Sequence, residues 1–134
     1  MRYLLDTNTC IAIIRKKSPT VVQKIRQHPV TAIAISTITI AELQYGVQRS
    51  GKTSQNQQAL NQFLLPFLFL DFDYAATQEY GIIRAYLEVQ GTPIGSLDML
   101  LASQARGHSL IFVTNNVKEF QRVPNLEIED WTKP

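Results

Sequence analysis

Short apolar runs alternate along this chain with stretches in which apolar residues recur every three or four positions. Runs of the first kind are typical of buried strands, and stretches of the second kind are typical of amphipathic helices. Strands are predicted at residues 2–5, 32–35, 67–72, 110–113 and, at a sheet edge, 126–128. Helices are predicted at residues 9–16, 19–25, 38–45, 60–64, 76–87 and 96–106. Strands separated by helices predict an α/β fold, a three-layer α/β/α sandwich with a mostly parallel central sheet.

One predicted helix carries a carboxylate on its apolar face. The residues at helical spacing on this face are Ile38, Ala41, Glu42 and Tyr45. Thr39 and Glu42 also have the spacing of a capping box, in which the glutamate bonds back to the start of the helix. A buried carboxylate is costly unless a partner satisfies it, and no basic residue lies one turn away on this face. Glu42 is therefore a candidate for a functional role.

Two aspartates lie close to the starts of predicted helices. Asp6 ends the first apolar run, where a carboxylate favours an N-cap role. Asp98 follows Ser96, a suitable cap, so its charge would favour the helix dipole. Because the carboxyl ends of parallel strands meet at one edge of a sheet, we expect Asp6, Glu42 and Asp98 to converge there.

Three carboxylates at one sheet edge would repel one another unless a cation were present. Mg²⁺ and Mn²⁺ prefer oxygen ligands, and either ion can make a water nucleophilic and stabilise charge on a phosphodiester oxygen. The three acids together therefore predict a metal-dependent hydrolase, although each of them alone also fits a structural role.

A polar cluster follows the fourth predicted strand and consists of Thr114, Asn115 and Asn116. It belongs at the same sheet edge, where a hydroxyl and amides could hold a water or a phosphate oxygen, although Asn also favours ordinary turns. Asn8 is a further candidate for this positioning role. Glu119 lies one helical turn beyond the cluster and could approach it, although a surface position is the interpretation we favour.

Composition limits the possible number of domains and the cellular location, but it does not indicate a particular reaction. A length of 134 residues suits one domain, 1–134, and a formal net charge of +2 does not by itself indicate a polyanionic partner. The single cysteine, Cys10, lies in an apolar stretch and fits a core position. No apolar run is long enough to span a bilayer, and the start of the chain lacks a basic region before an apolar stretch. We therefore expect a cytoplasmic protein without a membrane segment.

Several motifs in order resemble those of the PIN-domain ribonucleases, and among them the VapC toxins of toxin–antitoxin pairs. The matching stretches are residues 4–8, 36–46, 91–102, 113–120 and 128–131. The resemblance covers essentially the whole chain and implies a PIN-like fold. It also implies an endoribonuclease that depends on Mg²⁺ or Mn²⁺, with Asp6, Glu42 and Asp98 as the metal-binding and catalytic acids.

The same resemblance shows one departure from the family pattern. Many PIN domains carry a fourth acid after the last central strand, where this chain has Asn115 and Asn116. This departure puts a second metal ion in doubt, since an amide is a poorer ligand than a carboxylate. Thr114 would then position a water or a phosphate oxygen in the catalytic site.

The resemblance further implies partners for a cytoplasmic toxin. They are a structured RNA substrate such as tRNA, a small VapB-like antitoxin, and a second copy of the chain in a homodimer or in a larger assembly with the antitoxin. Basic residues must flank an acidic cleft that binds a polyanion. Candidates for contacts with RNA or antitoxin are Arg15, Lys16, Lys17, Arg49, Lys52 and Arg84.

Two other classes of protein share part of the pattern. A haloacid-dehalogenase-like phosphatase would use Asp6 as its nucleophile, but its motif requires a second aspartate where this chain has Asn8. A receiver-like binding domain would require an acid pair after the first strand and a phosphoacceptor after the third central strand. The chain offers Asp71 and Asp73 for the latter, although a polar strand end explains both residues as well.

Overall fold

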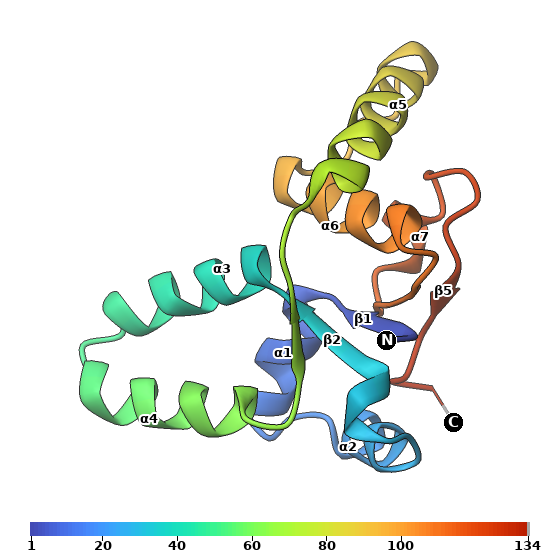
Figure 1. Cartoon of the computed structure of the whole chain (residues 1–134). Helices are drawn as coiled ribbons and strands as arrows, with labels where there is room; N and C mark the ends of the chain where they lie inside the picture. Colours follow the sequence, from blue (N-terminus) through green and yellow to red (C-terminus); the bar gives the residue numbers. More distant parts are fainter. Residues whose placement is uncertain (134) are drawn as a thin grey trace.

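The protein, described by a computed structural model for residues 1–133, has helices on both faces of a central sheet (Figure 1). The strands are β1 (Tyr3–Leu5), β2 (Ile33–Ser36), β3 (Leu68–Leu70), β4 (Ile111–Val113) and β5 (Ile128–Glu129). These five strands pair in the order β3-β2-β1-β4-β5, and every pair is parallel. The predicted α/β/α sandwich is confirmed, with a sheet that is wholly and not merely mostly parallel.

Six of the helices are those that the sequence pattern predicts. They are α1 (Thr7–Ile14), α2 (Pro19–Arg26), α3 (Thr37–Gln48), α4 (Thr53–Leu64), α5 (Tyr74–Gln90) and α6 (Ser96–Gly107). A 3-10 turn at Val30–Ala32 and the short helix α7 (Val117–Phe120) were not predicted, because so few residues cannot display a helical period. Within residues 1–133, no helix combines the length and the apolarity needed to cross a membrane.

The strand side chains point alternately into two separate cores. Leu4, Ala34 and Phe112 pack with residues of α5, α6 and α7, whereas their neighbours Leu5 and Ile35 pack with residues of α1 to α4. Figure 1 shows the first group of helices on one side of the strands and α1, α2 and α4 on the other. Since both faces are covered, nearly continuous apolar runs are the expected strand sequence.

β3 departs from the expectation of strands buried on both faces. Leu68 and Phe69 are 39% and 55% exposed, and only Leu70 of this strand is buried. β3 is the edge strand beside β2, so it has a strand neighbour on one side only. The sequence of an edge strand can be as apolar as that of a central one, so hydrophobicity alone does not tell the two positions apart.

The register of the central strands aligns their carboxyl ends. Leu5 is paired with Ile35 on one side and with Val113 on the other. The backbone N–H of Asp6 continues this ladder and donates to the carbonyl of Val113 at 3.0 Å. Asp6, the start of α3 and Thr114 therefore lie together at the edge where the candidate residues were expected to meet.

Candidate metal centre

Asp6 is a nearly buried carboxylate, 4% exposed, directly after β1. Its Oδ1 accepts a hydrogen bond from the N–H of Thr9 at 2.7 Å, and its Oδ2 accepts one from the hydroxyl of Thr114 at 2.6 Å. Asp6 is thus the N-cap of α1, which explains why this helix begins at Thr7 and not at the predicted Thr9. Because each carboxylate oxygen has a second lone pair, the capping role leaves acceptor sites free.

Burial raises the pKa of Asp6, although the hydrogen bonds from Thr114 and Thr9 oppose this effect. The hydrogen bonds fix the position of the carboxylate, whereas burial disfavours its charged form. A nearby cation would stabilise that charged form. Thr114 is itself buried, and its hydroxyl also accepts from the N–H of Asn116 at 3.0 Å. The structure therefore shows this hydroxyl orienting Asp6, and its contact with a water or a phosphate oxygen stays a prediction.

Glu42 lies in the second turn of α3, and the capping-box interpretation of Thr39 and Glu42 is wrong. The N-cap is Ser36, whose Oγ accepts from the N–H of Ile38. Oε1 of Glu42 instead accepts from the hydroxyl of Thr7 at 3.2 Å, and Thr39 shares a hydrogen bond with the same hydroxyl at 3.0 Å. These contacts join the start of α3 to the start of α1, next to Asp6.

Asp98 lies in the first turn of α6, whose N-cap is Gly95 and not the predicted Ser96. Burial, followed by the hydrogen bond and charge of Glu119 and by the charges of Asp6 and Glu42, raises the pKa of Asp98 to about 7. Near neutral pH the Asp98 carboxyl can therefore keep its proton and donate a hydrogen bond to the Glu119 carboxylate. The charges of Asp6 and Glu42 contribute to this increase, so both acids lie near enough to Asp98 to affect its ionisation.

Glu119 is the residue that the sequence analysis missed, and its prediction as a surface acid is wrong. It is half-buried at the carboxyl end of β4, where it accepts from the N–H of Gly95 at 3.3 Å and from Nδ2 of Asn116 at 2.7 Å. Burial opposes ionisation, but hydrogen bonds from Asp98, Gly95 and Asn116 lower the pKa of Glu119 overall. A fourth acid is therefore present after the last central strand, one turn beyond the asparagines.

The donor chemistry of this edge suits Mg²⁺ or Mn²⁺, because every acidic group contributes carboxylate oxygen. As the side chains stand, no three His, Cys, Asp or Glu residues within 1–133 are close enough together to hold an ion. Asp98 and Glu119 lie close enough for a side-chain hydrogen bond that raises the pKa of Asp98. Loss of the shared proton would release the Asp98 carboxylate toward a cation.

The other predicted polar residues are less closely tied to these acids. Asn8 and Asn115 are exposed, whereas Asn116 is half-buried and holds Glu119. Arg84 donates hydrogen bonds to Tyr80 and Glu88 of its own helix, α5.

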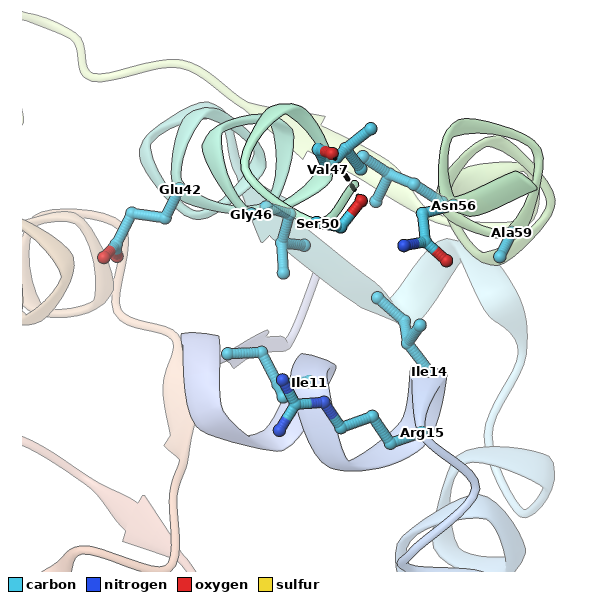
Figure 2. Close-up of a pocket in the computed structure, with 11 residues that line it drawn as sticks. Ile11, Ile14, Arg15, Glu42, Gly46, Val47, Ser50, Asn56 and Ala59 are labelled. Carbon is cyan, nitrogen blue, oxygen red and sulfur yellow. Dashed lines mark hydrogen bonds between the residues drawn. The ribbon is translucent and has the colours of Figure 1, made fainter. Parts of the chain in front are cut away.

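Two cations stand nearer to the acids. Arg15 and Glu42 line a cavity of about 250 Å³ between α1, α3 and α4. Lys16, the residue after Arg15, is exposed. Figure 2 shows the Glu42 carboxylate directed away from Asn56 and Ala59 in this cavity. Arg122, which the sequence analysis did not select, donates to the carbonyl of Pro93 at 3.1 Å, and its charge helps to lower the pKa of Glu119.

The acids proposed for a receiver-like site have a structural role. Asp73 is the N-cap of α5, where its Oδ1 accepts from the N–H of Ala76 at 3.1 Å, and its Oδ2 lies 2.7 Å from Nε2 of His108. Both Asp71 and Asp73 follow the edge strand β3, not a central strand. A polar strand end, the simpler of the two interpretations, describes them correctly.

Gly95 provides a local test of the Asp98 geometry. A Cβ added at Gly95 would lie 3.1 Å from Oδ2 of Asp98, so Gly95→Ala is expected to displace this carboxyl. If Asp98 serves the ribonuclease activity that the resemblance implies, RNA cleavage should fall by roughly tenfold, because small displacements of a reacting group carry large rate penalties. Gly81→Ala is the matched control, since its Cβ meets nothing within 4 Å. Initial rates measured side by side check this, and equal rates for both variants would contradict it.

Known proteins resemble this chain over nearly its whole length. The family model described as PIN domain matches residues 3–126. The chain is 44% identical to Ribonuclease VapC2 of Rickettsia felis, over 99% of this chain and all of the relative. It is 37% identical to the tRNA(fMet)-specific endonuclease VapC of Salmonella typhimurium, over 98% of both chains.

Solved structures agree with these relatives. The VapBC2 structure from Rickettsia felis, bound to a DNA fragment from its promoter, superposes with a TM-score of 0.92 at 44% identity, over 98% of this chain and 99% of the other. DNA-bound VapBC from Salmonella typhimurium gives a TM-score of 0.93 at 37% identity, with 98% of each chain covered. The likeness therefore extends over the whole fold.

Proposed function

This chain belongs to the PIN-domain family, in its VapC ribonuclease group, and on that premise we propose that it is a metal-dependent endoribonuclease and the toxin of a toxin–antitoxin pair. The full-length relatives support ribonuclease activity, and they do not support the phosphatase or the receiver alternative. The metal dependence is supported by one arrangement, the gathering of Asp6, Glu42, Asp98 and Glu119 at one edge of the sheet. A carboxyl with a pKa of about 7 beside three further acids is a place where a cation would replace that proton favourably.

We propose Mg²⁺ as the cofactor, with Mn²⁺ as an effective substitute, held by Asp6, Glu42 and Asp98. Glu119 supplies the fourth acid of the cluster. When bound, such an ion lowers the pKa of a water and stabilises negative charge on a phosphodiester oxygen. The wholly carboxylate donor set supports this choice of metal over the softer transition metals.

The remaining tasks belong to the side chains of the protein. The Thr9 N–H and the Thr114 hydroxyl hold Asp6 in one orientation, and the Thr7 hydroxyl restrains Glu42. A hydrogen bond with Glu119 raises the pKa of Asp98 and lowers that of Glu119, so the two carboxyl groups would share a proton in the absence of a cation. Fixing the acids in this way reduces the reorganisation that the reaction would otherwise require.

We propose a structured RNA of the tRNA class as the substrate. The Salmonella relative, 37% identical, is named for its action on tRNA(fMet), which supports this class without specifying the same tRNA. Arg15 lines the same cavity as Glu42, and the charge of Arg122 acts on Glu119. Such cations would offset the repulsion between a phosphate backbone and four carboxylates.

The partner proposed for this toxin is a small VapB-like antitoxin, as in the VapBC complexes that resemble it. We also propose a homodimer, or a larger assembly with the antitoxin, in the cytoplasm where its RNA substrate lies. Exposed apolar side chains on α5 support a self-association surface, because patches of this kind commonly mark protein interfaces. These side chains are Tyr74, Ile82, Tyr86 and Val89.

Sequencing of RNA 5′ ends after brief expression tests the proposed function. Wild type is expected to create new ends in a small set of structured RNAs and to arrest growth, whereas Asp98→Asn is expected to do neither. Co-expression with the proposed VapB-like antitoxin should suppress both effects. Identical ends in wild type and Asp98→Asn would rule out the proposed site.

A substrate comparison separates the ribonuclease from the phosphatase alternative. Glu42→Gln is expected to lose RNA cleavage, whereas a phosphatase that used Asp6 as nucleophile would still hydrolyse a small phosphomonoester in this variant. Phosphomonoester hydrolysis at equal rates in wild type and Glu42→Gln, without RNA cleavage by wild type, would favour the alternative.

A further inference from the structure

A buried glutamine on α6 joins the elements that carry Glu42 and Asp98. Gln104 is polar, yet it is 0% exposed and belongs to the buried residues of α6. Its Nε2 donates to the carbonyl of Leu70 at 3.1 Å, and its Oε1 accepts from the hydroxyl of Ser36 at 2.5 Å. One side chain of α6 thus binds the last residues of β2 and β3 at their carboxyl ends.

The direction of every hydrogen bond in this network is fixed. The Leu70 carbonyl can only accept, so the NH₂ group of Gln104 must face it. The amide oxygen then faces Ser36, whose hydroxyl must donate its proton there. The Ser36 oxygen is left to accept from the N–H of Ile38 at 3.0 Å, which caps α3. A buried network in which every member is satisfied in only one way specifies a single arrangement of its elements.

The network lies at the same distance along the chain from both acids. Ser36 precedes Glu42 by six positions, and Gln104 follows Asp98 by six positions. α3 begins directly after Ser36, so the bond between Ser36 and Gln104 connects the start of that helix to α6. An apolar side chain could fill the volume of Gln104, but it would leave the relative position of the two helices to packing alone.

We propose that Gln104 is a positioning residue that sets the separation of Glu42 and Asp98 across the acidic edge. The proposal rests on the metal-dependent function proposed above. Gln104 is fully buried and touches neither acid, so it acts through the placement of α3 and α6 and not on a substrate. Its removal should therefore weaken metal binding even where the protein remains folded.

Three substitutions separate positioning from simple packing. Gln104→Met keeps the volume and removes the hydrogen bonds, and Gln104→Glu keeps the acceptor for Ser36 but sets a carboxylate oxygen against the Leu70 carbonyl. Gln104→His retains one donor and one acceptor in neutral imidazole. Ser103→Ala is the matched control, because Ser103 is equally buried on α6 but bonds only to Met99 of its own helix.

The measurement is Mn²⁺ binding, followed from the free Mn²⁺ signal in electron paramagnetic resonance, with no RNA present. We expect the Mn²⁺ Kd to rise by roughly tenfold or more in Gln104→Met and Gln104→Glu, to stay near the wild-type value in Ser103→Ala, and to be partly recovered in Gln104→His. Thermal unfolding of the same samples identifies folded variants. A role in packing alone would lower Tm without changing the Kd at 25 °C.

Wild-type affinity in folded Gln104→Met would overturn the proposal. If that variant does not fold, wild-type affinity in Gln104→Glu would do the same, and so would an equal loss in Ser103→Ala. Wild-type protein that binds no Mn²⁺ would overturn the proposed function as well, whereas equal binding by wild type and the variants overturns only the role of Gln104.

Discussion

Asp6→Asn is expected to reduce RNA cleavage by a factor on the order of a thousand, because the metal ion it would help to hold supplies several kcal/mol of charge stabilisation and about 1.4 kcal/mol corresponds to tenfold in rate. The fold should survive. Asn keeps an acceptor for the Thr9 N–H, and the Thr114 hydroxyl can rotate to accept from the new amide. Since burial raises the pKa of Asp6, removing its charge should leave Tm unchanged or higher.

Asp73→Asn is the matched control for this variant. Asp73 also follows a strand and also caps a helix through the N–H three residues on, but it faces His108 and not the other acids. We expect full cleavage activity in Asp73→Asn. The two variants are compared by initial rate on one RNA substrate and by thermal unfolding. Comparable activity in both would show that Asp6 is only a helix cap.

This pair of aspartates also shows where a single sequence stops being informative. Asp6 and Asp73 have the same local pattern, an apolar strand followed by a carboxylate and a helix. What separates them is the sheet order, which places β1 in the centre and β3 at an edge. The resemblance to a family resolved this ambiguity, whereas periodicity and capping preferences alone could not.

Most of the fold was predictable because the two sheet faces are covered and the strands are short apolar runs. The errors came from features that depend on tertiary contacts. β3 carries the exposed Phe69 although its sequence is that of a buried strand, and α7 is too short to show periodicity. The helix starts at Thr7 and Thr37 depend on the caps Asp6 and Ser36, and the second cap was assigned incorrectly to Thr39.

The sequence predicted which acids gather at the sheet edge better than it predicted the hydrogen bonds that hold them. Asp6, Glu42 and Asp98 do lie at one sheet edge, and the charges of Asp6 and Glu42 raise the pKa of Asp98. Glu119 was assigned to the surface because its contact with Asn116, which holds its carboxylate beside the other acids, cannot be read from the sequence. Gln104 gave no signal, since a polar residue in an apolar helix is ambiguous until its partners are known.

The affinity for Mn²⁺ is expected to decrease steeply as the pH is lowered below about 7. Because the pKa of Asp98 is raised from 3.8 to about 7, the folded metal-free protein holds a proton that the cation must displace. Displacing one proton per site weakens binding by roughly tenfold per pH unit below that pKa, hence by about a hundredfold between pH 7 and pH 5. Above it, this dependence should level off.

The same pKa gives the sign of the stability change without metal. A group whose pKa is higher in the folded than in the unfolded state stabilises the fold fully below its unfolded value near 3.8, and this contribution is lost as the pH rises through about 7. Metal-free protein should therefore have a higher Tm at pH 5 than at pH 8 as far as Asp98 is concerned. Added Mn²⁺ should reduce or reverse that difference, because it binds the ionised acids.

Glu119→Gln tests whether the pair of acids, and not Asp98 alone, sets this pH dependence. Removing the Glu119 charge lowers the pKa of Asp98, so Mn²⁺ binding should remain independent of pH to lower values than in wild type. Titrations of Mn²⁺ between pH 5 and pH 8 measure the shift, with Glu88→Gln on exposed α5 as the control. An unchanged pH profile in Glu119→Gln would contradict the shared proton. A profile that moves as expected would assign Glu119 to the same electrostatic unit as Asp6, Glu42 and Asp98, since only coupled charges shift one another's titration.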